Sequence, residues 1–305
     1  MHALVTGISG YVGGLLAPAL LDAGHDVRGL ARHPERMAHR PGVPVISADL
    51  STGRGLDEAL DGIDLAYYLV HSMEGHTDFV AEELHAARHF ATRAAAAGVR
   101  RVVYMSVLTP DKPPEQYSEH VRSRIAVEHA LAAEGAEVIA LRASIVVGAG
   151  SRSFRFLLRL VERMPVLLLP PWRHNSTMPI DERDLLRELV QAATAPVDRP
   201  VSVFDAVGPD EVTYQDLIER LRDHLMLPRP TLPFPFALTA VTAPLAASVA
   251  GEDLGLVQPL MASLGSDLLP RRPDPYEVRL GPPRHHLDAA IERALRGSDC
   301  NRMED

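Results

Sequence analysis

The feature that most constrains this chain is a glycine-rich segment between a short apolar run, Ala3–Thr6, and a helix-like segment, Tyr11–Ala23. The segment reads Thr6-Gly7-Ile8-Ser9-Gly10-Tyr11-Val12-Gly13. In this spacing Gly7 turns the chain sharply, Gly10 lets the backbone approach a diphosphate, and Gly13 lets helix and strand pack closely. The amide groups at the helix start then face the phosphates. The segment predicts a dinucleotide-binding turn, and a purely structural turn is the alternative.

The first half of the chain alternates short β-branched runs with helix-like segments, which is typical of a parallel sheet covered on both faces. The expected strands are Ala3–Thr6, Asp26–Ala31, Val43–Ser47, Leu65–Val70, Arg101–Ser106 and Glu137–Leu141. The expected helices are Tyr11–Ala23, Leu56–Leu60, Thr77–Ala97 and Ser118–Ala133. Because crossovers between parallel strands are right-handed, the pattern predicts an α/β fold, a Rossmann doubly wound parallel sheet.

After Gly150 the pattern becomes mostly helical. The expected elements are a helix Ser153–Arg163, a strand around Met178–Ile180, a helix from Asp184, a strand Val201–Ala206, a helix from Thr213 to about Leu225 and a terminal helix near Leu287–Leu295. Prolines are frequent from Pro228 to Pro283, and periodicity there is poor. We therefore expect a Rossmann domain in residues 1–150, to which 176–206 returns. Residues 151–175 and 207–296 form a smaller substrate or lid lobe, and 297–305 a frayed tail.

Composition and charge limit the compartment and the partners. The single cysteine, Cys300, excludes an intramolecular disulfide and a cysteine zinc site, which favours a cytoplasmic location. The net charge of −9 disfavours nucleic acid as a partner. The charge-free run 230–251 contains Pro233, Pro235 and Pro244, so we interpret it as a buried or lid segment, with membrane contact as the minor alternative. We expect a monomer or homodimer that binds a small-molecule substrate.

The residues after the second expected strand predict which dinucleotide binds. An acidic side chain there holds the free ribose hydroxyl of NAD, whereas arginine accommodates the 2′-phosphate of NADP. Arg32 follows the strand and Arg36 comes one short turn later, so we predict NADP, with NAD as the alternative. A solvated surface charge is the other interpretation of Arg32. Asp49, followed by Leu50, is a candidate for the adenine amino group or for a helix N-cap.

Further motifs carry a resemblance to a known family. They are Ala48-Asp49-Leu50, Tyr67-Tyr68-Leu69-Val70-His71-Ser72-Met73, His120-Val-Arg-Ser-Arg124 with Val127-Glu128, Leu141-Arg142-Ala143-Ser144, Met178-Pro-Ile with Asp184, and Val207-Gly-Pro with Thr213-Tyr. With the glycine turn, they resemble the extended and atypical short-chain dehydrogenase/reductases, in particular the NmrA-like branch. The resemblance covers most of residues 1–226. It implies NAD(P) binding, and many such proteins are named NAD(P)H-binding proteins or nucleoside-diphosphate-sugar epimerases.

The catalytic signature of that family is altered here. The resemblance implies a Tyr-xxx-Lys pair in which tyrosine transfers a proton at the carbonyl oxygen and lysine holds the ribose. The single lysine, Lys112, has Leu108 four residues before it, so the pair exists nowhere in the chain. His120 and Arg124 take its place in the alignment, on one helix face. His120 is the candidate proton donor and Arg124 the candidate ribose ligand. The alternative is that both only bind ribose and order the helix.

Weaker candidates complete the predicted site. His71 ends the fourth strand on the ligand side of an α/β sheet, where a structural histidine is an equal alternative, and Tyr117 is a reserve proton donor. His85 and His89 share a helix face without completing a metalloprotease motif, so we predict no metal. The candidate cofactor-binding residues are Thr6, Gly7, Ser9, Gly10, Tyr11, Val12, Gly13, Arg32, Arg36, Asp49, Leu50, Val70, His71, Ser106, Arg124 and Ser144.

These observations together predict an NADP-dependent oxidoreductase that reduces a carbonyl or an activated C=C bond. The apolar stretches 166–172 and 232–249 indicate a small apolar substrate beneath a hydrophobic lid. A non-catalytic, NADP-binding redox sensor is the alternative, because a binding module keeps the glycine turn and loses the tyrosine and lysine. Isomerisation or dehydration of a sugar nucleotide is a third interpretation, which the missing pair disfavours.

Overall fold

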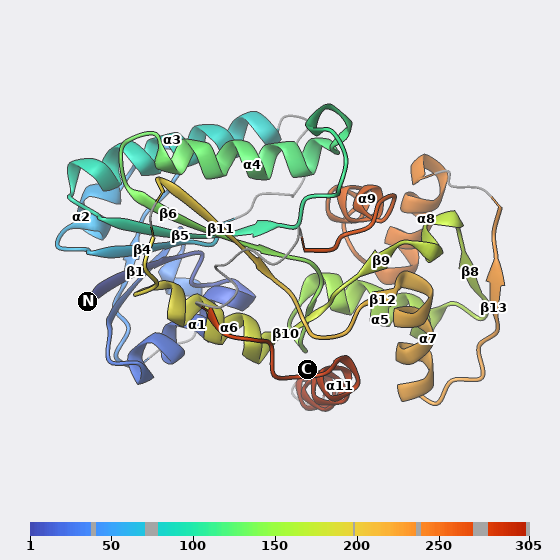
Figure 1. Cartoon of the computed structure of the whole chain (residues 1–305). Coiled ribbons are helices and arrows are strands. Elements are labelled where there is room, and N and C mark those ends of the chain that lie inside the picture. Colours follow the sequence, from blue (N-terminus) through green and yellow to red (C-terminus); the bar gives the residue numbers. More distant parts are fainter. Residues whose placement is uncertain (38–40, 71–78, 198, 236–238, 271–279, 303–305) are drawn as a thin grey trace.

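The protein consists of a helix-covered parallel sheet joined to a smaller, mostly helical lobe (Figure 1). The computed structural model describes residues 1–37, 41–70, 79–197, 199–235, 239–270 and 280–302, and all structural statements below refer to these.

The central sheet has seven strands, all parallel, in the order β11-β6-β5-β4-β1-β2-β3. They are β1 (His2–Thr6), β2 (Asp26–Ala31), β3 (Val45–Ser47), β4 (Leu65–Tyr68), β5 (Arg101–Val107), β6 (Glu137–Ala143) and β11 (Val201–Ala206). After β3 the chain crosses back to place β4 beside β1, so the strand order reverses between these two strands. In such sheets a ligand binds at the carboxyl ends of the strands beside that reversal. The predicted Rossmann sheet is confirmed.

Helices cover both faces of this sheet (Figure 1). α1 (Tyr11–Asp22) and α6 (Glu182–Ala192) lie on one face, and α2 (Leu56–Leu60), α3 (Phe79–Ala96) and α4 (Glu119–Ala132) on the other. Side chains alternate between the two cores, as the strand period requires. Ala3 and Val5 pack in the α1/α6 core, whereas Leu4 packs in the α2/α3/α4 core.

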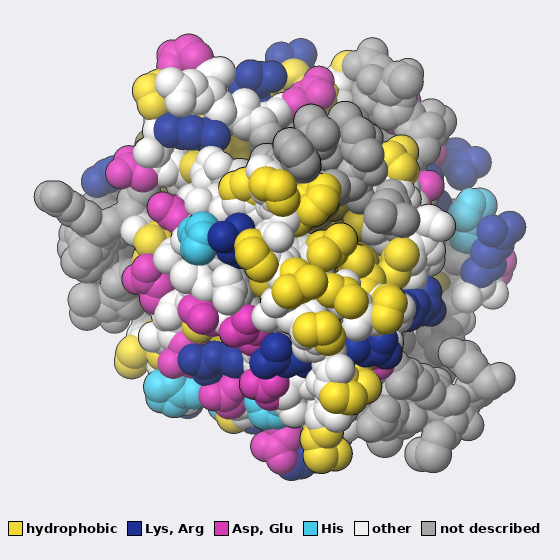
Figure 2. Space-filling view, turned by 90° about the vertical axis from the view of Figure 1, so that its right-hand side faces the viewer, with side chains coloured by type: hydrophobic (Ala, Val, Ile, Leu, Met, Phe, Trp, Pro, Cys, Tyr) yellow, Lys and Arg dark blue, Asp and Glu magenta, His cyan; other side chains and the backbone are white. Residues whose placement is uncertain are grey.

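The second lobe has its own apolar core, which includes Phe154, Leu217, Ala247, Val257 and Ile291. Its helices are α5 (Arg152–Arg163), α7 (Tyr214–His224), α8 (Thr239–Ala250), α9 (Leu254–Ser263) and α11 (Leu287–Arg302). Three small sheets pair β7 (Val146–Val147) with β10 (Ile180–Asp181), β9 (Ser176–Thr177) with β12 (Val212–Thr213), and β8 (Leu167–Leu169) with β13 (Thr231–Pro233). Figure 2 faces the outer end of this lobe and shows hydrophobic side chains gathered on its surface.

Local signals fix several boundaries. Thr213 forms the expected capping box at the start of α7, because its Oγ1 accepts from the Asp216 amide at 3.0 Å while its own amide donates to the Asp216 carboxylate at 3.2 Å. The strand expected around Met178–Ile180 is instead two short strands, β9 and β10, with Met178 between them.

Two other expectations are corrected in the C-terminal lobe. The region after Pro228, where no helix was expected before the terminal one, contains α8 and α9. Both helices are apolar on all sides and therefore lack the period of an amphipathic helix, and α8 also contains Pro244. α11 runs to Arg302, beyond the expected end of the terminal helix at Leu295. Gly297 lets this helix approach the β7 turn, since a Cβ there would lie 2.9 Å from the Ala149 Cβ. Among the described helices, none is long and apolar enough to cross a bilayer.

Candidate functional site

The glycine turn between β1 and α1 is lined by backbone atoms. Gly7 has a φ of +64°, and the Gly10 amide donates to its carbonyl at 2.9 Å. A Cβ at Gly13 would lie 2.4 Å from the Gly7 oxygen, and one at Gly10 would lie 3.1 Å from it. The turn therefore needs glycine at residue 7 for its φ and at residue 13 for steric reasons, and a side chain at residue 10 would be tight.

The start of α1 fits a diphosphate. Gly10 precedes the helix in an extended conformation and has no side chain that could cap it. The amide groups of the first turn are then available to an anion, which the helix dipole also favours. Ser9 and Gly10 are exposed, so this end of the helix is accessible.

Thr6 supports the turn from below. Its buried hydroxyl donates to the Tyr67 carbonyl and accepts from the Leu69 amide, both at 3.0 Å, which ties β1 to the end of β4. Leu69 and Val70 pack against Gly7, where an added Cβ would lie 3.5 Å from the Val70 Cγ2. His71, predicted near the cofactor, lies outside the described residues.

The side chain of Tyr11 joins α1 to the start of α6. Its hydroxyl donates to the Glu182 carboxylate, and Arg293 lies 3.5 Å from the same carboxylate. Burial, and then the contact with Glu182, raise the pKa of Tyr11 well above its usual range. Gly150 makes room for the ring, because a Cβ there would lie 2.5 Å from the Tyr11 Cδ2. The turn that includes Gly148 and Gly150 thus contacts Tyr11, while Val12 packs against the sheet core.

The two arginines at the end of β2 are exposed. Arg32 directly follows the strand, and Arg36 ends a short 3-10 helix, Pro34–Arg36, with its Nε 3.9 Å from Glu35. Asp49 accepts a hydrogen bond from the Ser51 amide at 2.8 Å, so its carboxylate stabilises a local turn, whereas α2 begins after Gly55. Leu50 is buried in the core.

A cavity of about 170 Å³ lies at the carboxyl ends of β5 and β6. Four of the predicted site residues line it, namely Ser106, His120, Arg124 and Ser144. Phe156 and Leu157 of α5 and Leu260 of α9 close it from the second lobe. We call this the redox cavity, after the reduction that the sequence predicts at His120. Tyr117 is buried but does not line it.

The helix that carries His120 and Arg124 is fixed at its first turn. Ser118 caps α4, its Oγ accepting from the Val121 amide at 3.3 Å. Arg124 is 8% exposed, donates to the Met105 carbonyl, and stacks on Tyr104 with its Cζ 4.7 Å from the ring centroid. The guanidinium is therefore held rigidly at the wall of the cavity.

A buried polar network lies behind the cavity, and the sequence reasoning missed it. The Ser106 hydroxyl donates to Glu128 at 2.6 Å, and Arg142 donates to the same carboxylate at 2.7 and 3.0 Å. Burial opposes the charge of Arg142, but the hydrogen bonds and charge of Glu128 outweigh it and raise the pKa of Arg142. The one signal available was Arg142 in the otherwise apolar run 138–143, whereas Glu128 lies in a helix with several other charged residues. Ser144 donates to the Met178 carbonyl at 2.7 Å.

The redox cavity contains one imidazole among the described side chains that line it, that of His120. Arg124 supplies a fixed positive charge, and most of the remaining wall is apolar.

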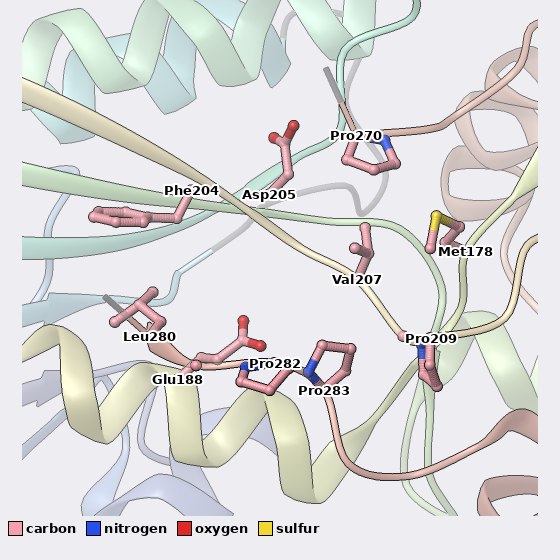
Figure 3. A pocket seen from close by; sticks show the side chains of 12 residues that line it. Met178, Glu188, Phe204, Asp205, Val207, Pro209, Pro270, Leu280, Pro282 and Pro283 are labelled. Atoms are coloured by element: carbon pink, nitrogen blue, oxygen red, sulfur yellow. The ribbon is translucent and has the colours of Figure 1, made fainter. Parts of the chain in front are cut away.

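A larger cavity, of about 500 Å³, lies at the sheet edge beside β11 (Figure 3). Glu188 of α6 and Asp205 of β11 lie on different sides of it, with Pro282 and Pro283 beside Glu188. Its wall reaches Pro270 and Leu280, which flank residues 271–279 outside the described structure. We assign no site to it, because its outline there is not described and because His120 and Arg124 line the other cavity.

The fold and the glycine turn define a Rossmann-type dinucleotide-binding protein. Residues 7–146 match the model of a family described as NAD(P)H-binding. A ceramide reductase from Caulobacter vibrioides is 30% identical over 243 residues, which cover 77% of this chain and 75% of that protein. The chain belongs to this NAD(P)H-binding family of short-chain dehydrogenase/reductase-type oxidoreductases.

Other relatives match a shorter stretch. The (4-alkanoyl-5-oxo-2,5-dihydrofuran-3-yl)methyl phosphate reductase of Streptomyces griseus is 38% identical over 111 residues, 36% of this chain and 36% of that protein. The match to this relative therefore spans about a third of its length. Among solved structures, the Bordetella bronchiseptica enzyme WbmG in complex with NAD and UDP shares the fold, with a TM-score of 0.73, 18% identity, and coverage of 98% of this chain and 94% of that chain.

Proposed function

We propose that this protein is an NADP-dependent reductase that acts on a carbonyl or an activated C=C bond in an apolar substrate. The observation that carries the proposal is the redox cavity, which places His120 and Arg124 at the carboxyl ends of β5 and β6 under apolar side chains of α5 and α9. This is the edge of the sheet at which the glycine turn also lies.

The residues that would hold the coenzyme are those at the reversal of strand order. The amide groups at the start of α1 would bind the diphosphate, and Arg32 with Arg36 would bind the 2′-phosphate. When bound, the reduced coenzyme supplies the hydride. The remaining chemistry falls to the protein.

His120 then delivers the proton that balances the reaction. Reduction of a C=O or C=C bond adds a hydride to one atom and a proton to the atom that becomes negative, and the protonated imidazole of His120 would give that proton. Arg124, held by the Met105 carbonyl and the Tyr104 ring, supplies a fixed positive charge at the wall of the cavity. Phe156 and Leu157 exclude water from the reacting carbon.

The relatives support a reductase with an apolar substrate. They include a ceramide reductase and a 3-beta-hydroxysteroid dehydrogenase, each named for a largely apolar molecule. Ceramides and steroids are named only for these relatives. For this chain we propose a substrate that shares their apolar character.

A redox sensor that binds NADP without turnover is the second candidate. One observation favours it: the Ser106 hydroxyl, at the end of β5, donates to Glu128 and is therefore directed away from a substrate. The absence of a Tyr-xxx-Lys pair from the sequence also favours the sensor.

Oxidation of NADPH with a panel of ketones and enones separates the two candidates. We expect substrate-dependent oxidation, and a fall of about 10²- to 10⁴-fold in kcat for His120→Ala. His129→Ala, an exposed histidine on the same helix, is the matched control and should retain activity. Tight binding of both NADP⁺ and NADPH without turnover on any substrate would favour the sensor. Full activity of His120→Ala would remove the proposed role of that residue.

A further inference from the structure

Another cavity, of about 210 Å³, lies within the C-terminal lobe. We call it the second cavity, and the redox cavity the first. Its described walls come from α5, α8, α9, β8 and the segment around Trp172, and they contain no charged side chain. Well-packed interiors have few voids larger than a water molecule. A large apolar cavity stays dry and accepts an apolar guest.

Helix α5 connects this cavity with the redox cavity. Leu157 lines both, and Leu160, Val161 and Met164 continue from it at the spacing of one helix face to line the second. Ser153, at the other end of the helix, lines the redox cavity. Ser153 and Met164 are about 16 Å apart along the helix axis, the order of length of a long alkyl chain.

Two further contacts cross between the cavities. Tyr214 lines the redox cavity and Trp172 lines the second one, with their rings edge to face at a centroid distance of 6.1 Å. In α9, Leu260 faces the first cavity and its neighbour Met261 the second. The two cavities therefore share walls in three separate places.

The second cavity reaches the surface at β8. Leu168 lines it and is 44% exposed, and Leu232, its register partner on β13, is 49% exposed. These strands lie at the end of the lobe where Figure 2 shows hydrophobic side chains gathered. The side chains between the redox cavity and this end are thus mostly apolar, whereas the redox cavity itself offers Arg124, Ser144 and Ser263 to a polar group.

We propose that the second cavity is a tail chamber, and that the substrate is an amphiphile with a long alkyl chain. Its reducible carbonyl or double bond lies beside His120, and its chain passes Leu157 into the chamber between α5 and α8. This assignment rests on the proposed reductase function and adds the substrate class to it.

The first test is a homologous series of methyl ketones from butanone to hexadecanone, assayed with NADPH below the solubility limit of each ketone. Each methylene buried in an apolar site increases kcat/KM about three- to fourfold. We expect this rise to continue with chain length and to level off once the chain fills the chamber. Equal kcat/KM values along the series would overturn the tail chamber and leave the reductase function standing.

The second test fills the chamber. Ala246 and Val249 of α8 line it, so Ala246→Phe and, separately, Val249→Phe should lower the ratio of long-chain to short-chain kcat/KM by more than tenfold. Ser248→Phe adds the same ring to an exposed position of the same helix and should keep the ratio of the original protein. Thermal melting of each variant shows whether the lobe is folded. Because the two chamber variants are made separately, chain-length selectivity is measured twice independently.

A binding measurement separates this proposal from the proposed function. Calorimetry with hexadecanone and with butanone needs no turnover. Saturable binding of the long ketone that is lost in Ala246→Phe, without oxidation of NADPH, would keep the tail chamber and overturn the reductase. Unchanged chain-length selectivity in both chamber variants, or no preference for the long ketone in binding, would overturn the tail chamber.

Discussion

The carboxylate of Glu128 on α4 accepts hydrogen bonds from two nitrogens of the Arg142 guanidinium on β6, at 2.7 and 3.0 Å. The side chain of Glu128 is 1% exposed and that of Arg142 is 14% exposed. This bidentate pair attaches the helix that carries His120 to the strand whose end lines the redox cavity. The geometry of the site thus depends on a pair that need not touch the substrate.

Breaking this pair should destabilise the protein strongly. Glu128→Leu leaves the Arg142 charge buried without its partner, so we expect a loss of about 3–5 kcal/mol in the free energy of unfolding, measured by urea denaturation. The double variant Glu128→Leu/Arg142→Met removes both charges and should recover most of the loss. A double variant as unstable as the single one would show that packing, and not the ion pair, accounts for the effect.

A methyl group at Gly13 should damage both the fold and coenzyme binding. The new Cβ would lie 2.4 Å from the Gly7 oxygen, so the backbone of the turn must shift. We expect Gly13→Ala to lower the free energy of unfolding by about 1–3 kcal/mol and to weaken NADPH binding at least tenfold, measured by denaturation and calorimetry. Gly265→Ala is the control, because its Cβ would have an ordinary contact of 3.5 Å in the other lobe. Undiminished NADPH binding in Gly13→Ala would argue against a diphosphate at this turn.

The exposed arginine at the end of β2 should determine coenzyme preference. We expect Arg32→Glu to weaken NADPH binding by about 10- to 100-fold, since it removes a charged hydrogen bond to the 2′-phosphate. Binding of NADH, which lacks that phosphate, should be affected much less. The ratio of the two dissociation constants is the measurement. Arg54 is an exposed arginine that follows β3. Arg54→Glu makes the same change in net charge and tests whether the net charge of the protein explains the result.

Stability at low pH should depend on Asp181. Burial opposes ionisation of this carboxyl, but hydrogen bonds from the Arg183 guanidinium and amide outweigh it and hold the pKa of Asp181 below its usual range. The unfolded chain therefore binds the proton first, and the stabilisation present at neutral pH is lost as pH falls below about 3.9, the ordinary value.

Urea denaturation at neutral pH and at about pH 3 checks this expectation. Asp181→Asn still caps α6 but carries no charge, so it should be less stable than the original protein at neutral pH. The difference should shrink in acid. A difference that stays constant over this range would show that the charge of Asp181 does not contribute.

Much of the fold was predictable because its signals are local. The strands of the sheet are buried β-branched runs, and the start of α7 is a capping box within four residues. The helices α8 and α9 were not predicted. An apolar, alanine-rich segment with an internal proline has no amphipathic period, and its helical form is stabilised by packing in the second core.

The candidate site likewise has a part that local sequence signals predict and a part that they do not. The turn at Gly7, Gly10 and Gly13 was readable, because φ and close backbone approach restrict these positions to glycine. His120 and Arg124 were placed on one helix face by their spacing. That Ser106 donates to Glu128 and that Tyr11 contacts Glu182 depends on residues distant in sequence. The hydrogen bond that Asp49 accepts from the Ser51 amide depends on the local path of the chain.

The sequence by itself determined the parallel sheet and the dinucleotide turn, because both follow from backbone sterics or side-chain period within a few residues. His120 became the candidate proton donor through the family resemblance. Only the tertiary structure decided that Glu128 and Arg142 meet, and that α5 joins the redox cavity to a second, apolar one. Both arise where elements far apart in the chain pack together. The distances between such elements are set by the whole core, and no local pattern contains them.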